Sequence, residues 1–320
     1  AATRLRRLDP DIDIVVLERS GFVSYANCGL PYYVGGVIKD HDALLLQTPE
    51  SLDARFKLDV RVGSEVTGID RDRKSVNVVS ADGAYDLSYD TLILSPGAQP
   101  IVPPIPGIER AHTLRTVEDV TGIAEAVNAR PSSAVVIGGG FIGVESAENL
   151  VHRGVPTAII EAAPQLLAPL DPEMAAVVHR EVRANGVDLV LADSVARIDA
   201  GHVVLASGRQ VPAELVIAAI GVRPDITLAK AAGLEIGERG GIVVDEFGRS
   251  SDPQIYAIGD VAEKIDALDG EATLVPLANI ANRQGRTAAD HIAGRAVRPV
   301  ATIGTAIVKV FDRTVAATGW

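Results

Sequence analysis

Short apolar runs separated by amphipathic stretches recur along this chain. The clearest case covers residues 132–164 and reads SSAVVIGGGFIGVESAENLVHRGVPTAIIEAAP. AVVI and TAIIE predict two short buried strands, and ESAENLVHRG between them predicts a helix. Alternation of buried strands with helices is typical of α/β domains built on a parallel sheet. The pattern therefore predicts the α/β class.

Three glycines separate the first of these strands from the helix. Gly138, Gly140 and Gly143 occupy the positions of a G-x-G-x-x-G turn. The first permits a tight turn, the second lets a pyrophosphate approach the backbone at the helix N-terminus, and the third lets helix and strand pack closely. Because the turn lies between a predicted strand and helix, and the next strand ends in Glu161, the segment predicts a dinucleotide site.

Glu161 decides which nicotinamide coenzyme is expected. Its carboxylate should accept hydrogen bonds from the adenosine ribose hydroxyls. The segment that it opens, EAAPQ, holds no arginine or lysine to pair with a 2′-phosphate. The sequence thus favours NADH, and NADPH stays open as the alternative because a basic residue distant in sequence can still reach the site.

The first residues repeat the second half of this pattern. AATRLRRLDPDIDIVVLER reads as a helix, a turn and a strand, with Glu18 in the place of Glu161. Such an internal repeat predicts a second dinucleotide-binding unit. We expect its own first strand and glycine turn to precede Ala1 in a longer parent chain. The alternative is an ordinary helix–strand pair with a solvated Glu18.

Three more apolar strands end at a glycine. They are DTLILSPGA, ELVIAAIGVRPD and QIYAIGD. Ligands of open α/β sheets bind outside the carboxyl ends of such strands. Asp260, which follows the last strand, is a candidate to hold a ribityl or ribose hydroxyl, and the alternative is a helix N-cap.

Composition narrows the class of protein. Apolar residues make up 47% and charged residues 22% of the 320 residues, which predicts two or three globular domains. The net charge of -12 argues against a nucleic-acid partner, and no apolar run is long enough to cross a bilayer, so no membrane partner is expected. The histidines, among them His152 and His179, show no paired ligand spacing, so no metal is expected.

Cys28 is the only cysteine. A single cysteine excludes an intrachain disulfide and a cysteine-rich zinc site, and it fits a reducing, cytoplasmic compartment. CGLPYYVGG predicts a short helix that begins at Cys28 and is capped by Gly35 and Gly36. Backbone N–H groups at a helix N-terminus favour the thiolate. The plain alternative is a buried, inert thiol.

Four motifs, in order along the chain, carry a family resemblance. TLILSPGA, GGGFIGVE, AAIGVRPD and SSDPQIYAIGD resemble the linking motifs of the flavin-dependent pyridine nucleotide–disulfide oxidoreductases. The resemblance implies two Rossmann-like dinucleotide-binding domains and the start of an α+β dimerisation domain, hence a homodimer. The implied boundaries are 1–115 and 245–300 for FAD binding, 116–244 for NAD binding, and 301–320 for the first strands of the dimerisation domain.

The segment around Cys28 is similar to the single-cysteine branch of that family. Two-cysteine members carry a C-x4-C pair, whereas Tyr33 stands five residues after Cys28 here. ANCGLPYY is most similar to coenzyme A-disulfide reductases and NADH-dependent persulfide reductases. The resemblance implies an enzyme that passes electrons from NADH through FAD to Cys28, which reduces coenzyme A disulfide, a persulfide or a polysulfide. The alternatives are an NADH oxidase or peroxidase that cycles Cys28 through a sulfenic acid, and a truncated, catalytically silent NADH-binding chain.

The resemblance also assigns roles by position. The substrate-binding residues are Arg4, Arg7, Ser24, Asn27 and Asn282, with the arginines expected on coenzyme A phosphates. The cofactor-binding residues, besides the glycines and glutamates above, are Arg19, Asn27, Val66, Pro96, Gly97, Phe141, Ile142, Glu145, Gly221, Gly259, Asp260, Leu277 and Ala278. The plain alternatives are a solvated helix face for the arginines, turn hydrogen bonds for Ser24 and Asn27, and a core position for Phe141.

Overall fold

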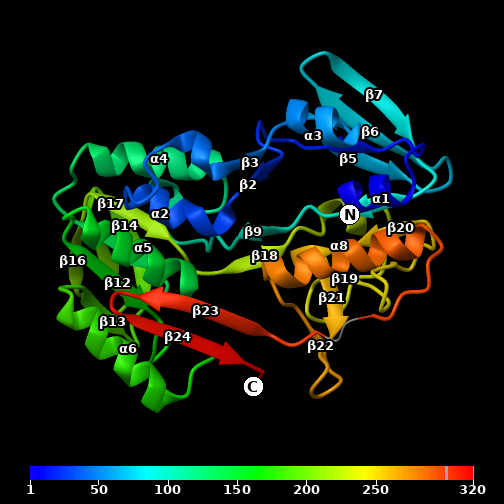
Figure 1. Cartoon of the computed structure of the whole chain (residues 1–320). Coiled ribbons are helices and arrows are strands. Elements are labelled where there is room, and N and C mark those ends of the chain that lie inside the picture. The colour runs from blue at the N-terminus through cyan, green and yellow to red at the C-terminus, as the bar shows by residue number, and fades with distance from the viewer. Residues whose placement is uncertain (300–301, 320) are drawn as a thin grey trace.

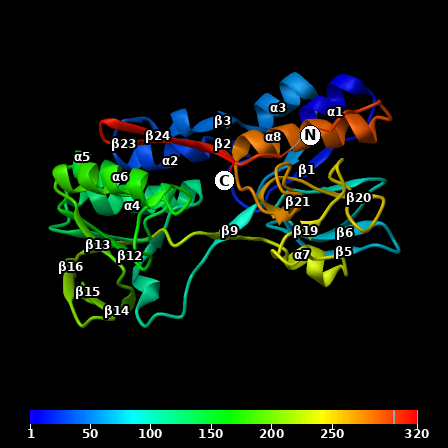
Figure 2. The ribbon, with the colours of Figure 1, turned by 90° about the horizontal axis from the view of Figure 1, so that it is seen from below.

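The computed structural model describes residues 1–299 and 302–319. Its elements gather into two lobes, joined by the antiparallel strands β9 (Ala98–Pro100) and β18 (Val222–Pro224) (Figure 1). Seen from below, the same two strands run from one lobe to the other (Figure 2). The chain therefore enters the second lobe through β9 and returns to the first lobe through β18, and these two strands are paired.

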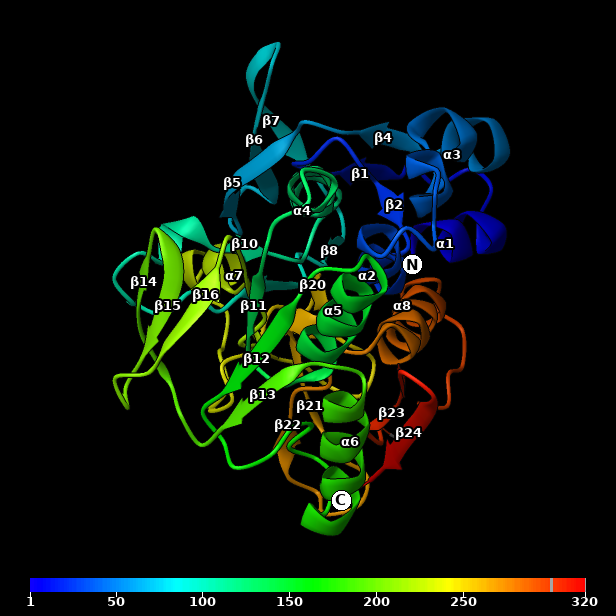
Figure 3. The ribbon, with the colours of Figure 1, turned by 90° about the vertical axis from the view of Figure 1, so that its left-hand side faces the viewer.

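The second lobe is built on a parallel sheet of order β10-β17-β11-β12-β13 (Figure 3). Its strands are β10 (His112–Thr113), β11 (Ala134–Ile137), β12 (Thr157–Glu161), β13 (Asp188–Leu191) and β17 (Leu215–Ala218). The helices are α4 (Val117–Asn128), α5 (Phe141–His152) and α6 (Pro172–Ala184). A small antiparallel sheet is formed by β14 (Val195–Asp199), β15 (Gly201–Leu205) and β16 (Gln210–Ala213).

Both faces of this parallel sheet are buried. Along β11, Val136 joins the apolar cluster formed with α4 and α5, whereas Val135 and Ile137 join the cluster formed with the small antiparallel sheet. Successive side chains of a strand point to opposite faces, so a strand covered on both sides is apolar throughout. This explains why AVVI is a continuous apolar run rather than an alternating one.

The first lobe combines shorter pieces. Two parallel pairs are β1 (Val15–Leu17) with β4 (Asp59–Arg61), and β8 (Leu92–Leu94) with β20 (Ile255–Ala257). An antiparallel meander consists of β5 (Glu65–Asp70), β6 (Ser75–Ser80) and β7 (Gly83–Ser88). A further three-stranded sheet consists of β19 (Ile242–Val243), β21 (Ala262–Ile265) and β22 (Ala272–Thr273). The helices are α1 (Ala2–Leu8), α3 (Pro49–Phe56), α7 (Thr227–Ala231) and α8 (Ala278–Ile292).

Two further segments pack on the second lobe although they lie far away in sequence. One holds β2 (Ser24–Tyr25), a 3₁₀ turn (Asn27–Gly29), α2 (Leu30–Val34) and β3 (Leu45–Gln47). The other is the antiparallel hairpin β23 (Thr305–Val310) and β24 (Arg313–Thr318). Both contribute to the helix-side cluster of the parallel sheet, with the buried residues Leu30, Val34, Leu44, Val308, Val310 and Phe311. The second lobe thus fixes the position of the helix that follows Cys28.

The predicted class and elements agree with the structure. The α/β class with Rossmann-like parallel sheets is confirmed, and the predicted strands and helices of residues 132–164 are present. The alternative of a helix N-cap at Asp260 is wrong, because Asp260 lies inside a short 3₁₀ turn (Gly259–Val261). The domain boundaries stay a prediction, and residues 300, 301 and 320, which they include, lie outside the described residues. Among the described residues, no helix has both the length and the apolar character needed to cross a bilayer.

Candidate active site and dinucleotide sites

The three glycines of the turn before α5 occupy three different environments. Gly138 has a φ of +107°, and a Cβ there would collide with the carbonyl oxygen of Ala219. A Cβ on Gly143 would collide with the carbonyl oxygen of Gly138. A Cβ on Gly140, by contrast, would meet no atom within 4 Å. The turn is therefore tight at its first glycine, closely packed at its third, and open at its second, where a pyrophosphate could reach the backbone.

Glu161 is held at the end of β12 by two backbone groups. Its Oε2 accepts a hydrogen bond from the Gly139 N–H at 2.6 Å, and its Oε1 accepts one from the Ala163 N–H at 2.7 Å. These bonds fix the carboxylate beside the glycine turn, and each oxygen keeps a further lone pair for a ligand. No ion pair joins Glu161 to a basic residue in residues 1–299 and 302–319. The environment therefore suits ribose hydroxyls better than an added phosphate.

Cys28 is exposed and lies within the 3₁₀ turn that leads into α2. The helix itself has five residues, with Pro31 in its first turn and Gly35 at its C-terminal cap. Gly36 follows with a φ of +73°, a conformation that favours glycine. The predicted short helix with glycines at its end is thus present, although the helix begins at Leu30 rather than at Cys28. The alternative of a buried thiol is wrong.

Tyr32 and Glu145 bring the cysteine segment and α5 together. Burial raises the pKa of Glu145 to about 7, the Glu148 carboxylate adds to the rise, and the Tyr32 hydroxyl opposes it by hydrogen bonding. Burial also raises the pKa of Tyr32, with contributions from Glu145, Glu148 and Cys28. Tyr32 therefore interacts both with Cys28 and with a carboxyl whose pKa is raised to about 7.

A second group of charged residues surrounds Asp260 in the first lobe. Burial raises the pKa of Asp260, against the opposing effect of Arg115 and Lys264. Lys264 is only 6% exposed, and its Nζ donates to the carbonyl oxygen of Gly259 at 3.3 Å. Burial lowers the pKa of Lys264 to about 8, against the effect of Asp260. A buried ammonium group with so few partners favours an anionic or hydrogen-bonding ligand beside it.

The 3₁₀ turn at Asp260 is tied to α8. The N–H of Gly259 donates to Oε1 of Gln284 at 2.8 Å, and α8 begins at Ala278 directly after its cap, Leu277. The predicted cofactor residues Gly259, Asp260, Leu277 and Ala278 therefore belong to two elements that contact each other. They form one neighbourhood of the first lobe.

Other predicted residues lie at element ends or on helix surfaces. Arg4 forms an ion pair with Asp290 at 2.7 Å, and the guanidinium of Arg7 lies 5.8 Å from the ring centre of Phe56. Arg19 lies 3.9 Å from Asp225. Ser24 is in β2, Asn27 is exposed beside Cys28, Asn282 is exposed on α8, and Val66 is in β5.

The remaining predicted cofactor residues lie next to the ends of strands or at the start of α5. Pro96 and Gly97 come after β8, and Gly221 comes before β18. Glu18 directly follows β1, and its Oε1 accepts a hydrogen bond from the N–H of Ser20 at 2.8 Å. Phe141 and Ile142 begin α5 at the glycine turn and pack partly buried against the core. The core position of Phe141 is therefore compatible with a place at the ligand edge.

Sequence reasoning missed Tyr32, Arg115, Lys264 and Gln284. Tyr32 stands four residues after Cys28, a spacing that places two residues on the same side of a helix. Lys264 stands in VAEKID, directly after Glu263 and close to Asp266, so the sequence gives no sign that its side chain is buried. Arg115 and Gln284 likewise carry no local signal, because their partners are distant in sequence.

Comparison with known proteins relates this architecture to a family. Residues 1–285 match the family model described as pyridine nucleotide-disulphide oxidoreductase. The NADH oxidase of Methanocaldococcus jannaschii is 34% identical, over 99% of this chain and 72% of its own.

Two solved structures are similar over nearly the whole chain. Reduced CoADR-RHD of Bacillus anthracis is 48% identical, with a TM-score of 0.97 over 99% of this chain and 59% of its own. The NAD-dependent persulfide reductase of A. fulgidus is 40% identical, with a TM-score of 0.96 over 100% of this chain and 62% of its own. The chain thus spans about three fifths of these two proteins, and it belongs to the pyridine nucleotide-disulphide oxidoreductase family.

Proposed function

We propose that this protein is an FAD-dependent oxidoreductase that carries electrons from NADH to Cys28 and reduces a coenzyme A disulfide, persulfide or polysulfide. One observation carries the proposal. Helix α5 begins at the glycine turn and, in its second turn, presents Glu145 to Tyr32 in the neighbourhood of the exposed Cys28. One rigid helix therefore links the predicted NADH site to the predicted reactive sulfur.

The cofactor-binding residues are assigned by the same reasoning. The open face of Gly140, with Glu161 beside it, fits the pyrophosphate and ribose of NADH. The Asp260 neighbourhood, with the nearly unpartnered ammonium of Lys264, fits the polar part of FAD. When bound, FAD supplies the chemistry that the chain lacks, because it accepts a hydride and passes two electrons to sulfur.

Cys28 performs the chemistry that belongs to the chain. Its thiolate attacks one sulfur of the substrate disulfide, so that a Cys28–S–S bond forms and the substrate S–S bond breaks. The released coenzyme A thiolate takes up one proton. The whole reaction is NADH + H⁺ + RSSR → NAD⁺ + 2 RSH, which consumes one proton. Glu145, whose pKa lies at about 7, is suited to hold that proton near Cys28.

The similar proteins support a sulfur substrate and leave one rival. A persulfide reductase is 40% identical to this chain, and CoADR-RHD is 48% identical. The M. jannaschii relative, at 34% identity, is an NADH oxidase, which favours the second candidate, an oxidase that cycles Cys28 through a sulfenic acid. We further propose a homodimer, a cytoplasmic location, and the division into FAD- and NAD-binding domains that the family resemblance implies.

The intact mass of the unreduced protein, beside a Cys28→Ser control, tests the proposal. A mass increase equal to coenzyme A, released by reductant and absent from the control, is the expected result. A single added oxygen on Cys28 would instead support the oxidase. An unmodified Cys28 would require the purified protein to show flavin absorbance and NADH-dependent persulfide reduction. If Cys28 is unmodified and flavin absorbance or NADH-dependent persulfide reduction is missing, the proposed function is wrong.

A further inference from the structure

His179 makes a contact that the proposed reaction does not use. It is half-buried on α6, and its Nε2 accepts a hydrogen bond from the backbone N–H of Leu166 at 3.0 Å. Leu166 belongs to residues 162–170, here named the Glu161 loop, which follows β12. An imidazole nitrogen can accept a hydrogen bond only when it carries no proton, so this contact requires the neutral ring with its proton on Nδ1.

The Glu161 loop rests directly on the glycine turn. The N–H of Leu167 donates to the carbonyl oxygen of Gly139 at 2.9 Å, and a Cβ on Gly139 would collide with the Leu166 side chain. Leu166 and Leu167 are 0% and 1% exposed. Leu167 has a φ of +51°, which a leucine adopts only where its surroundings hold it. The loop therefore includes one residue in an unfavourable backbone conformation, and contacts on both sides hold it there.

The same loop supplies one of the two hydrogen bonds that orient Glu161. At its beginning, the N–H of Ala163 donates to Oε1 of Glu161 at 2.7 Å, while the N–H of Gly139 donates to Oε2 at 2.6 Å. Leu166, three residues later, is the point at which α6 holds the loop. A shift of the loop at Leu166 would move both the Ala163 N–H and the Leu166 side chain that packs on Gly139.

We propose that His179 is a positioning residue for NADH binding, because its neutral imidazole holds the Glu161 loop on the glycine turn and thereby orients the Glu161 carboxylate. This inference rests on the proposed function, since it takes the glycine turn as the NADH site. It gives a role to a histidine that shows no paired ligand spacing in the sequence.

Two effects act on the imidazole, and both favour its neutral form. Burial lowers the pKa of His179, and Arg183, one turn further along α6, lowers it too. The Glu161 loop itself has no titratable side chain. Of the strands beside α6, β13 carries Asp188, which pairs with Arg209, and β23 carries Lys309, which lies 3.9 Å from Glu148. On α6 itself, Glu181 is paired at 3.1 Å with Arg313 of β24. The ring therefore stays neutral near pH 7, and the Leu166 contact is lost only as the pH falls through this lowered pKa.

The dissociation constants of NADH and of ADP-ribose for the purified protein provide the test. His179→Leu leaves the Leu166 N–H without its acceptor and should weaken both ligands about 3- to 10-fold. His179→Gln places an amide oxygen near the position of Nε2 and should retain affinity within about 2-fold. The wild-type affinity should also fall relative to His179→Gln as the pH falls through the pKa of His179, which burial and Arg183 lower from its ordinary value.

Hydrogen–deuterium exchange distinguishes positioning from a general loss of stability. Exchange in residues 162–170 should rise in His179→Leu, stay slow in His179→Gln, and be unchanged in the control His202→Gln on β15. The inference is overturned if His179→Leu binds NADH like wild type, or if His179→Gln loses as much affinity as His179→Leu. If His179→Leu does not fold, the comparison of wild type with His179→Gln across pH decides. A wild-type protein that does not bind NADH would refute the proposed function instead, and this inference with it.

Discussion

At the scale of single residues, Glu145 has the most unusual environment. Its carboxyl is largely buried, and Glu148 lies three residues further along α5, where two side chains of a helix are neighbours. Glu148 is itself only 3% exposed, and its Oε2 accepts a hydrogen bond from the Phe311 N–H at 2.9 Å. Burial raises the pKa of Glu145, and the neighbouring Glu148 carboxyl adds to the rise, so the protonated form of Glu145 is favoured.

This environment predicts a pH-dependent stability. The pKa of Glu145 rises from 4.5 to about 7 on folding, so below 4.5 both states are protonated and folding carries no penalty. Between these values only the unfolded state loses its proton, and stability falls as pH rises. Glu145→Gln removes the effect. The quantity to compare is the free energy of unfolding of Glu145→Gln minus that of wild type, measured by urea denaturation. This difference should be larger at pH 8 than at pH 5 by about 1 kcal/mol.

A matched control separates burial from charge alone. Glu125 is exposed on α4, so Glu125→Gln should change stability equally at both pH values. A Glu145→Gln protein with the same stability difference from wild type at pH 5 and pH 8 would contradict the assigned environment.

At the scale of elements, two glycines of the strand–turn–helix unit have different roles. Gly138 is needed for the stability of the fold, and Gly140 is needed for NADH binding. Gly138 needs a φ of +107° and touches the Ala219 carbonyl, so Gly138→Ala should lower the free energy of unfolding by about 2 kcal/mol or more. Gly140 has a φ of -76° and open space around its Cα. Gly140→Ala should therefore keep wild-type stability but weaken NADH at least about 10-fold, because its methyl group lies where the pyrophosphate approaches.

Thermal melting and NADH titration of the two variants check this assignment. A Gly140→Ala protein that binds NADH like wild type would place the dinucleotide elsewhere. A Gly138→Ala protein of unchanged stability would contradict the turn geometry.

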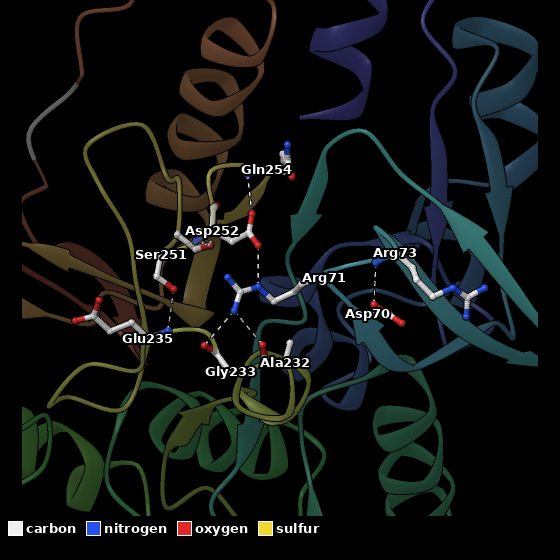
Figure 4. A network of polar contacts seen from close by, with 10 residues as sticks. Asp70, Arg71, Arg73, Ala232, Gly233, Glu235, Ser251, Asp252 and Gln254 are labelled. Carbon is white, nitrogen blue, oxygen red and sulfur yellow. Dashed lines mark hydrogen bonds and ion pairs between the residues drawn. The ribbon is translucent and has the colours of Figure 1, made fainter.

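Another element contact holds the meander of β5, β6 and β7 on the first lobe. Arg71 donates from Nε to Asp252 at 2.7 Å and from Nη1 to the carbonyl oxygens of Ala232 and Gly233 at 3.4 and 3.5 Å (Figure 4). The side chain of Asp252 is 12% exposed. The guanidinium thus joins three segments that are far apart in sequence.

Removal of this guanidinium should destabilise the protein. Arg71→Met leaves a mostly buried carboxylate without its cation, and we expect the free energy of unfolding to fall by about 1–3 kcal/mol. Arg73 is a matched control, because it lies 3.6 Å from Asp86 with 69% of its side chain exposed. Arg73→Met should change stability by less than about 0.5 kcal/mol. Equal effects of the two substitutions in urea denaturation would refute the role of Arg71.

These contacts show which part of the molecule the sequence predicts. The strands and the helix of residues 132–164 are predicted by the spacing of apolar residues, and the turn is predicted by its glycines. Both signals depend on residues that are close together in sequence. The Arg71–Asp252 pair joins positions 181 residues apart, and the His179–Leu166 bond depends on how α6 packs. Local patterns carry no information about such partners, so Arg71, Lys264 and His179 could be assigned only from the structure.

At the scale of the whole molecule, the cysteine segment packs on the second lobe. Leu30, Val34 and Leu44 are at most 1% exposed within the core that α4 and α5 share with the parallel sheet. Arg153, at the end of α5, donates to the carbonyl oxygen of Val34 at 3.1 Å. The segment that carries Cys28 is therefore packed on the same lobe as the glycine turn.

Gly35 is the closest point of this packing. Its φ of -69° suits any residue, yet a Cβ there would collide with the Asn149 side chain of α5. Gly35→Ala should therefore lower the free energy of unfolding by about 1–3 kcal/mol through overpacking alone and reduce NADH-dependent disulfide reduction. Gly21→Ala, in open space, should change neither the stability nor the activity.

Asn149→Ala makes room for the methyl group of Gly35→Ala, so the double variant should be more stable than the sum of the two single effects predicts. Strict additivity in this cycle would mean that α2 does not pack on α5 at Gly35.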